Sequence, residues 1–172
     1  MLSPEGIVPQ VRAIRADEVL RLRAFRLHAL ADAPSAFGST LEREQAFPEE
    51  VWQERAVRGA AGEDRVIYIA EAGDRWLGMA TGLVEDPHGP QVALVGMFVE
   101  PAVRGRGVGA ALVGAVTAWA RGRGAARLFL AVTSTNDAAI RLYYHCGFRP
   151  TGREKPLDHT PSLLELEMVR EL

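Results

Sequence analysis

Two arginines and three glycines between residues 104 and 109 carry the most evident chemistry in this sequence. The run Arg104-Gly105-Arg106-Gly107-Val108-Gly109 follows an apolar strand and the break Glu100-Pro101, and it opens a predicted helix. Glycines let the backbone approach an anion closely, and the first amides of a helix point outward at its positive end. The two arginines add cations that can reach phosphate oxygens. The segment therefore predicts a phosphate-binding loop.

The same glycines half-match a dinucleotide-binding fingerprint, which would suggest a nucleotide-dependent oxidoreductase. That fingerprint requires an acidic residue near the end of the next strand, about twenty residues on, to hold the ribose. The next predicted strand, 127–132, runs into Thr133 and Ser134 and carries no carboxylate there. A Walker loop is excluded because no Lys-Ser or Lys-Thr pair follows the glycines. The oxidoreductase alternative thus rests on the glycines alone.

A second segment, 136–148, follows one helix and one strand later. It begins at an asparagine, carries an aromatic residue near its end and closes with Gly-Phe. In this order the two segments resemble the GNAT superfamily of acyl-CoA-dependent N-acetyltransferases, over roughly the stretch 92–148. The residues that fit the pyrophosphate loop of that family are Arg104, Gly107 and Gly109. Those that fit its following helix are Asn136, Tyr143, Gly147 and Phe148.

The resemblance implies acetyl-CoA as co-substrate, no metal, and a set of site residues. The backbone of Met97, Phe98 and Val99 would pair with the pantetheine, and the amide of Phe98 or Val99 would polarise the thioester carbonyl. Asn136 would fix the pantetheine arm, and Tyr143 would protonate the departing thiolate. The pyrophosphate would be bound by the amides of Gly105, Arg106, Gly107, Val108, Gly109 and Ala110.

Each of these residues also has a purely structural interpretation. Met97, Phe98 and Val99 would be apolar core residues in any fold, and the glycines could be turn residues. Asn136 could be only a helix cap, a role that is compatible with binding. Tyr143 could be a packing aromatic; its neighbour Tyr144 faces another direction on the helix. Cys146 would fill a gap beside Gly147, since nothing near it in sequence supplies a base.

The sequence departs from the family pattern at the general base. Many relatives carry a glutamate at positions that correspond here to Ala93 or Ala131, and alanine cannot accept a proton. Freeing a lysine-like amine with a pKa of ~10.4 at pH 7 costs about 4.6 kcal/mol, against about 1.4 kcal/mol for an α-amine with a pKa of ~8. We therefore expect either an acceptor amine of low pKa or a base from a loop. The loop candidates are Glu85, Asp86, His88 and His159.

The acceptor pocket in this fold usually lies between the loop after the first helix and the connection of the last two strands. Those segments are 32–40 and 155–162, and together they present a mixed surface that includes Phe37, His159 and several prolines. The sequence leaves a small-molecule amine and a peptide N-terminus open as acceptors. A non-catalytic acyl-CoA-binding module is the alternative from another class, because both glutamates are missing.

The length and composition of the chain predict a single domain. The chain has 172 residues, 48% of them hydrophobic, which suffices for one core over 11–172 behind a loose arm at 1–10. The formal charge of −2 and the lack of a basic block argue against nucleic acid as a partner. The single Cys146, the absence of a signal-like N-terminus and the lack of a membrane-spanning run predict a cytoplasmic protein with no membrane partner. Relatives commonly form homodimers, but nothing in the sequence marks an interface.

The elements that must position these residues can be predicted from periodicity and turn signals. Strands are expected at 11–15, 66–70, 76–83, 92–99, 127–132, 148–154 and 163–170. Helices are expected after Asp17 as cap, at about 48–57 with Trp52 as anchor, at 107–123 and at 136–145. In the first of these helices, the face to be buried is Leu20, Ala24, Leu27 and Leu30. This order agrees with the GNAT resemblance, which implies an α/β (α+β) fold. That fold has a mixed, mostly antiparallel seven-stranded sheet, about four flanking helices and two parallel central strands that splay apart around the cofactor.

Overall fold

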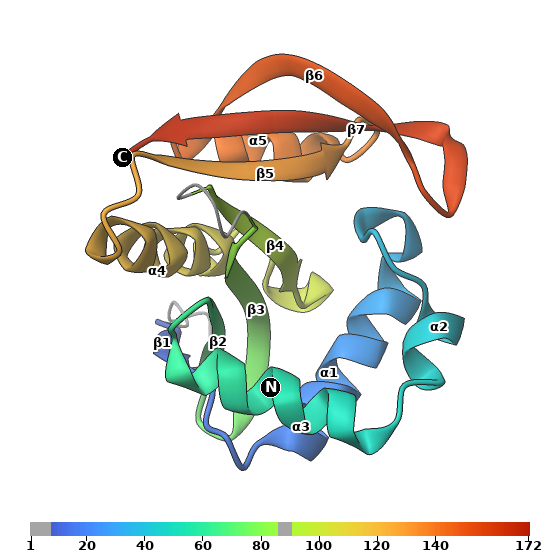
Figure 1. The fold of residues 1–172 in the computed structure, drawn as a ribbon, viewed down its shortest axis with the longest axis vertical. Helices are drawn as coiled ribbons and strands as arrows, with labels where there is room; N and C mark the ends of the chain where they lie inside the picture. Colours follow the sequence, from blue (N-terminus) through green and yellow to red (C-terminus); the bar gives the residue numbers. More distant parts are fainter. Residues whose placement is uncertain (1–7, 86–90) are drawn as a thin grey trace.

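Seven strands form one mixed sheet, in the order β1-β2-β3-β4-β5-β7-β6 (Figure 1). The computed structural model describes residues 8–85 and 91–172. The strands are β1 (Gln10–Ala13), β2 (Arg65–Ala72), β3 (Arg75–Val84), β4 (Val92–Val99), β5 (Arg127–Thr133), β6 (Arg149–Leu157) and β7 (Thr160–Glu171). The helices are α1 (Val19–Asp32), α2 (Leu41–Gln45), α3 (Glu49–Ala61), α4 (Val108–Gly122) and α5 (Asp137–His145), with short 3-10 turns η1 (Pro34–Ala36) and η2 (Pro101–Val103).

The centre of the sheet diverges where β4 meets β5. This is the one parallel pair among the described strands, and its register holds only two residue pairs, Val92 with Leu128 and Ala93 with Phe129. Beyond these pairs the two strands separate toward their carboxyl ends. The predicted fold class is thus confirmed: the sheet is mostly antiparallel and its parallel central strands splay.

A bulge in β4 accompanies this divergence. The register with β3 shifts between Met79 and Thr81, so that one β3 residue faces two residues of β4. Gly96 lies in this irregular stretch at φ +60°, a left-handed conformation that glycine adopts without strain. The bulge bends β4 just before the predicted pantetheine-binding residues 97–99.

Helices cover the two faces of the sheet differently (Figure 1). On one face, α1 and α3 pack over β1–β3, where Ile67 and Ile69 join Trp52 in a buried cluster. On the opposite face, Ala70 belongs to a larger cluster with Leu112 of α4 and residues of β5 and α5. Strands β5–β7 therefore keep one face free of helices, and this uncovered face adjoins the divergence of β4 and β5.

The buried face of α1 differs from the predicted one. Leu20 is 74% exposed and Ala24 is exposed, whereas Leu22, Ala29 and Leu30 are buried. The interpretation based on Leu20 and Ala24 was wrong because the buried stripe passes through Leu22 and includes an arginine. Arg26 is half-buried, where it forms an ion pair with the buried Glu44, and hydrophobic periodicity does not detect such a pair.

The predicted cap of α1 was also wrong. Glu18, not Asp17, occupies the N-cap, and its side chain makes no capping hydrogen bond. Its carboxylate instead accepts two hydrogen bonds from Arg12, at 2.9 and 2.8 Å, and one from the amide of Arg15 at 2.9 Å.

The other helices and the hairpin follow the prediction closely. Helix α3 begins after Pro48 and buries Trp52 completely, and β2 and β3 form the expected hairpin at Gly73. The short helix α2, capped by Thr40, was not predicted. Most of the predicted arm, 1–7, and most of the predicted link between β3 and β4, 86–90, lie outside the described residues. Across the described ranges, no helix combines the length and apolarity needed to cross a bilayer.

Candidate active site

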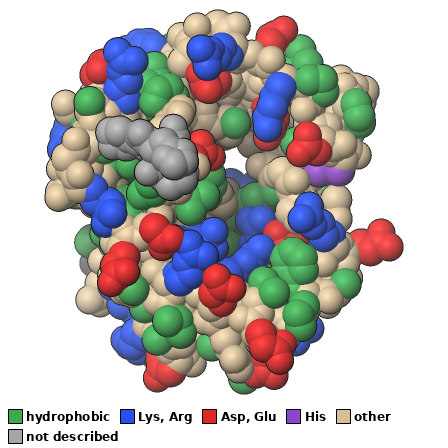
Figure 2. Space-filling model, viewed as in Figure 1, with side chains coloured by type: hydrophobic (Ala, Val, Ile, Leu, Met, Phe, Trp, Pro, Cys, Tyr) green, Lys and Arg blue, Asp and Glu red, His purple; other side chains and the backbone are tan. Residues whose placement is uncertain are grey.

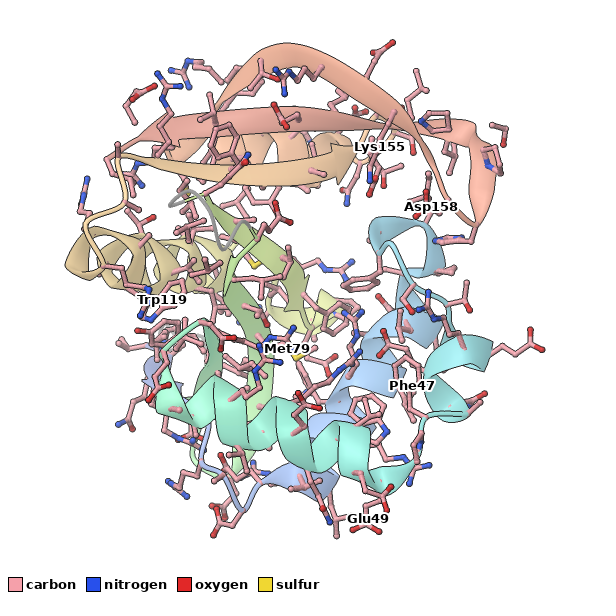
Figure 3. All side chains as sticks on the ribbon, in the orientation of Figure 1. Phe47, Glu49, Met79, Trp119, Lys155 and Asp158 are labelled. Carbon is pink, nitrogen blue, oxygen red and sulfur yellow. The ribbon has the colours of Figure 1, made fainter. Side chains whose placement is uncertain are left out.

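A cavity of about 320 Å³ lies on the uncovered face, beside the divergence of β4 and β5. Figure 2 shows a hollow that passes through the molecule in this region. Residues from five strands or strand ends line the cavity, including Ala93, Val95, Ala131, Lys155, Glu165 and Glu167. Lys155, labelled in Figure 3, lines the cavity from β6, and Asp158, also labelled, lies in the β6–β7 turn that follows.

The predicted phosphate loop connects β4 to α4. Gly105 and Gly107 have φ of +74° and +85°, and a Cβ at either position would meet nothing within 4 Å. Both glycines are therefore required by backbone conformation, not by crowding. Gly107 is the N-cap of α4, so the amides of the first turn, from Val108 onward, are left without partners inside the helix. The loop thus combines open space with outward amides at the positive end of a fifteen-residue helix.

Gly109 has a different reason to be glycine. A Cβ there would lie 2.8 Å from Cδ2 of Leu142 on α5 and 3.3 Å from Cε of Met97 on β4. The glycine lets α4 approach α5 and β4 closely, so it serves packing at the base of the loop.

The two arginines of the loop differ in their contacts. Arg104 donates through Nε to the carbonyl of Val99 at 2.9 Å and through Nη2 to Asp32 at 3.0 Å. It therefore ties the end of β4 to the end of α1, a contact that the sequence did not predict. Arg106 is exposed on the loop.

Residues 97–99 present alternating backbone groups to the divergence. The amide of Glu100 donates to the carbonyl of Leu77 on β3 at 2.8 Å, and the carbonyl oxygen of Phe98 lies close to Gly78 on the same strand. Because backbone groups alternate along a strand, those of Val99 point away from β3, toward the gap with β5. The sequence did not distinguish whether the amide of Phe98 or that of Val99 would polarise the thioester carbonyl. In the structure, only the Val99 amide faces the gap. The side chain of Phe98 is buried, and Met97 and Val99 are half-buried.

Asn136 caps α5, in agreement with the structural interpretation. Its Oδ1 accepts a hydrogen bond from the amide of Ala139 at 3.2 Å, and its own amide donates to the carbonyl of Thr133. The residue therefore holds the start of α5 against the end of β5, beside the divergence.

Tyr143 is buried on the α4–α5 face, with only 5% of its surface exposed. Its ring packs edge-on against Phe148 at a centroid distance of 5.8 Å. Burial raises the pKa of the Tyr143 phenol well above its ordinary value, so the hydroxyl keeps its proton at neutral pH. Tyr144, which faces another way, is 41% exposed. Partial burial likewise raises the pKa of the Cys146 thiol, which favours its protonated form.

The structure distinguishes among the loop residues considered as bases. Asp86 and His88 lie outside the described residues, and Glu85 lines the cavity. In His159, Nε2 donates to the carbonyl of Phe37 at 2.7 Å and Nδ1 lies 3.0 Å from the hydroxyl of Thr160. Both ring nitrogens of His159 are thus engaged, and the Nε2 contact joins the β6–β7 turn to the loop that carries Phe37.

The two loops predicted to border the acceptor pocket do lie together. We call residues 33–40, between α1 and α2, the strap. The hydroxyl of Thr133, at the end of β5, donates to the carbonyl of Ser35 at 2.6 Å, and His159 of the β6–β7 turn holds Phe37. Asp32, the last residue of α1 before the strap, is joined to β4 through Arg104, which also binds the carbonyl of Val99. The strap therefore spans the wide end of the divergence and closes it into a ring.

Sequence reasoning missed the two glutamates of β7 in the cavity. Glu165 and Glu167 lie opposite Thr133 and Ala131 in the β5–β7 ladder. The alternation Leu164-Glu165-Leu166-Glu167-Met168 was a visible signal, because it places two carboxylates on one face of a strand. Their position beside Ala131 depends on the strand order β5-β7-β6, which local sequence does not reveal.

Comparisons with known proteins agree with this geometry. The sequence model of the Acetyltransferase (GNAT) family matches residues 27–148. An N-acetyltransferase of Streptomyces griseus is 30% identical over 161 residues, which cover 88% of this chain and 79% of that protein. A GCN5-related N-acetyltransferase from Kribbella flavida is 26% identical, with a TM-score of 0.76 over 99% of this chain and 100% of the other.

A further solved structure supports the fold. The Salmonella typhimurium protein yncA, solved with acetyl-CoA, has a TM-score of 0.79 at 18% identity, over 95% of this chain and 94% of that one. The match to the family model covers the phosphate loop and the Asn136–Phe148 segment, which sets aside the dinucleotide-binding alternative. The chain belongs to the GNAT family of acetyltransferases.

Proposed function

We propose that this protein transfers an acetyl group from acetyl-CoA to a primary amine of a small molecule or a peptide N-terminus. The transfer is a direct attack in a ternary complex. The observation that carries the proposal is the ring-shaped opening between β4 and β5, which joins the phosphate loop on one face to the cavity on the other. A thioester held in such an opening can be approached by an amine from the opposite side.

The residues around the opening fit acetyl-CoA. The free space at Gly105 and Gly107 leaves room for a diphosphate beside the α4 amides. The amide of Val99 faces the gap and can donate to the cofactor, whereas the carbonyl of Val99 already accepts a hydrogen bond from Arg104. Asn136, fixed as the cap of α5, lies on the other side of the same gap.

The chemistry requires a polarised carbonyl and a proton for sulfur. Acetyl-CoA supplies the activated acetyl thioester. The Val99 amide points into the gap, where it can donate to the thioester oxygen as negative charge develops there. Tyr143, protonated and held by Phe148, gives its proton to the departing sulfur.

The acceptor side favours a compact amine. The cavity of about 320 Å³ is lined by residues of five strands or strand ends, among them the carboxylates of Glu85, Glu165 and Glu167. The strap closes the opening beside it through the hydrogen bond from Thr133 to Ser35. A ring of this kind admits a small molecule or the end of a chain more readily than a side chain on a folded surface. The carboxylates favour an acceptor that arrives as a cation.

The test is cofactor binding followed by turnover. A ligand at one hundred times its Kd adds about 2.7 kcal/mol, so saturating acetyl-CoA should raise the Tm by roughly 5–10 °C. CoA serves as a second ligand and NADH as the negative control. Thiol release is then measured with spermidine, L-lysine and alanylalanine, which present amines of different pKa.

The outcomes separate the two classes of function. A Tm rise with acetyl-CoA and thiol release with at least one amine would support the transferase. A Tm rise without release from any of the amines would favour the acyl-CoA-binding module. The absence of a Tm rise with acetyl-CoA would contradict both.

A further inference from the structure

We propose that Glu167 on β7, the residue paired with Ala131 of β5, is the general base of this acetyltransferase. The inference rests on the proposed function and deepens it by naming the group that receives the amine proton. It is carried by the register of β5 and β7, by the cavity, and by the different partners of the two β7 carboxylates: an ion pair for Glu165 and a hydrogen bond for Glu167.

An acceptor amine would meet the opening beside β5, where this strand parts from β4. The last paired residue of β5 with β4 is Phe129, so the gap begins immediately after it. Leu130 and Val132 point to the buried α4–α5 face, whereas Ala131 lines the cavity. Thr133, the next residue on the cavity side, is bound to the strap. Ala131 is therefore the β5 residue beside the narrow part of the opening on the acceptor side.

Glu167 lies directly opposite Ala131 on the neighbouring strand. The two residues are directly paired in the antiparallel ladder, and both line the same cavity. Side chains paired in this way stand on one face with Cβ atoms about 4.5–5.5 Å apart. The methyl group of Ala131 leaves space above β5, and a glutamate on the neighbouring strand is long enough to use it.

Glu167 and Glu165 differ in the partners of their carboxylates. The carboxylate of Glu165 lies 3.5 Å from the ammonium group of Lys155, so its charge has a partner. Glu167 accepts one hydrogen bond, from the hydroxyl of Thr151 at 2.9 Å, through Oε1. Within residues 8–85 and 91–172 it forms no ion pair. Its charge and its Oε2 are therefore available to an ammonium group in the cavity.

Other charged groups share the cavity with Glu167. They come from the end of β3, from β6 and from β7: Glu85, Arg153, Glu154, Lys155 and Glu165. Two of the five are cations, so the carboxylate of Glu167 faces charges of both signs.

The proton and electron balance of the step is simple. Glu167 takes a proton from the amine nitrogen, directly or through one water molecule. The N–C bond forms, the C–S bond breaks, and the phenol of Tyr143 gives a proton to sulfur. Glu167 then loses its proton to solvent through the open cavity, and Tyr143 regains one.

The kinetic test compares Glu167→Gln with a matched control, Glu171→Gln. Glu171 stands on the same strand and the same face, but its side chain is 71% exposed, pairs with Arg127 and is four residues farther from the opening. With the fastest amine of the panel, Glu167→Gln should lower kcat/KM by about 10²-fold or more, the range of general-base catalysis. It should also make log kcat/KM rise with pH up to the pKa of the amine itself. Glu171→Gln should leave both the rate and the profile unchanged.

A rescue variant separates chemistry from folding. Ala131 is exposed on the cavity side, so Ala131→Glu places a carboxylate on β5 without entering the core. The double variant Ala131→Glu with Glu167→Gln should recover at least tenfold of the lost rate and the original pH profile. A glutamate with a merely structural role on β7 would not be replaced in this way.

A binding readout does not depend on the acceptor. The side-chain carboxyl ¹³C resonance of Glu167, assigned by its loss in Glu167→Gln, should shift when acetyl-CoA is added, whereas that of Glu171 should not. No shift of the Glu167 resonance, or an unchanged rate in Glu167→Gln, would overturn the assignment while leaving the transferase function intact. Wild-type protein that binds acetyl-CoA but acetylates none of the amines would overturn both.

Discussion

Tyr143 is almost completely buried in the core cluster that α4 and α5 form against the sheet, and its ring packs edge-on against Phe148. Tyr143→Phe keeps the ring and its packing on Phe148 and removes only the hydroxyl. We expect kcat to fall by about 10²-fold or more, since a positioned acid typically contributes about 10²–10⁴-fold. The Kd for acetyl-CoA, measured by calorimetry, should stay nearly constant.

The adjacent residue provides the control for this prediction. Tyr144 is 41% exposed and faces away from Tyr143, so Tyr144→Phe should leave kcat unchanged. A large loss of acetyl-CoA affinity in Tyr143→Phe would mean that the phenol binds the cofactor and does not act as the acid.

Single residues were predictable where the backbone dictated them. Gly107 and Asn136 were both found from local sequence, because a left-handed N-cap and an asparagine cap leave clear signals. The contact of Arg104 with Asp32 was not, since it joins residues 72 positions apart. Glu167 was missed for the same reason: its neighbour Ala131 lies on a different strand, 36 residues earlier in the sequence.

At the scale of elements, the start of α4 is the feature most sensitive to charge. Any side chain at Gly107 is strained at φ +85°, but none would clash. Gly107→Ala and Gly107→Glu should therefore lose similar stability, about 1 kcal/mol. Only Gly107→Glu should abolish the Tm rise with acetyl-CoA, because its carboxylate opposes the phosphates at the helix N-terminus.

Equal loss of the acetyl-CoA effect in both variants would contradict this explanation. It would indicate that loop conformation alone, and not the electrostatics of the α4 N-terminus, determines cofactor binding.

The short helix α2 is held by a buried charge cluster. Glu44 is 1% exposed and receives hydrogen bonds from Arg26 of α1 and Arg55 of α3 at 2.9–3.1 Å. Glu44→Gln leaves two arginines without their counter-charge, which should cost about 3 kcal/mol and lower the Tm by roughly 6–12 °C. Differential scanning calorimetry checks this value.

Glu42→Gln, on the exposed side of the same helix, is the matched control and should change the Tm by less than about 2 °C. If both variants behave alike, the cluster does not hold α2.

The same cluster explains which elements were hard to predict. The strands and α4 were found because their apolar residues follow a regular period, and the β2–β3 hairpin because Gly73 marks its turn. Helix α2 has only five residues, too few to show a period, and its buried residue is charged. The buried stripe of α1 was misplaced because Arg26 lies in it.

At the scale of the whole molecule, paired carboxylates make stability depend on pH. The hydrogen bonds of Arg12 lower the pKa of Glu18 to about 2, although burial opposes this. At Glu44, burial raises the pKa, but the hydrogen bond and charge of Arg26 together with Arg55 outweigh it, so the pKa is lowered there too. Both folded-state values lie below the unfolded ones. The stability that these groups contribute is therefore complete above about pH 4.5 and is lost as the pH falls toward 2.

The Tm measured from pH 7 to pH 3 should consequently be flat at first and decline below about pH 4.5. Glu18→Gln should lower the Tm at pH 7 and reduce the slope of the acid decline, because one of the titrating groups is gone. A parallel decline in wild type and variant would exclude Glu18 as a source of the effect.

The strap determines how molecules can enter the passage between the two faces of the sheet. Thr133 and His159 bind the strap itself, and Arg104 binds Asp32 immediately before it. The passage between the two faces is therefore enclosed by a closed ring of residues. Two separate reactants can enter this passage from its opposite ends, in either order. A conjugate that already joins CoA to a bulky amine must instead pass one of its ends through the whole passage. Such a conjugate should associate slowly, and Thr133→Val, which unfastens one side, should speed its association in stopped-flow measurements more than it changes that of acetyl-CoA.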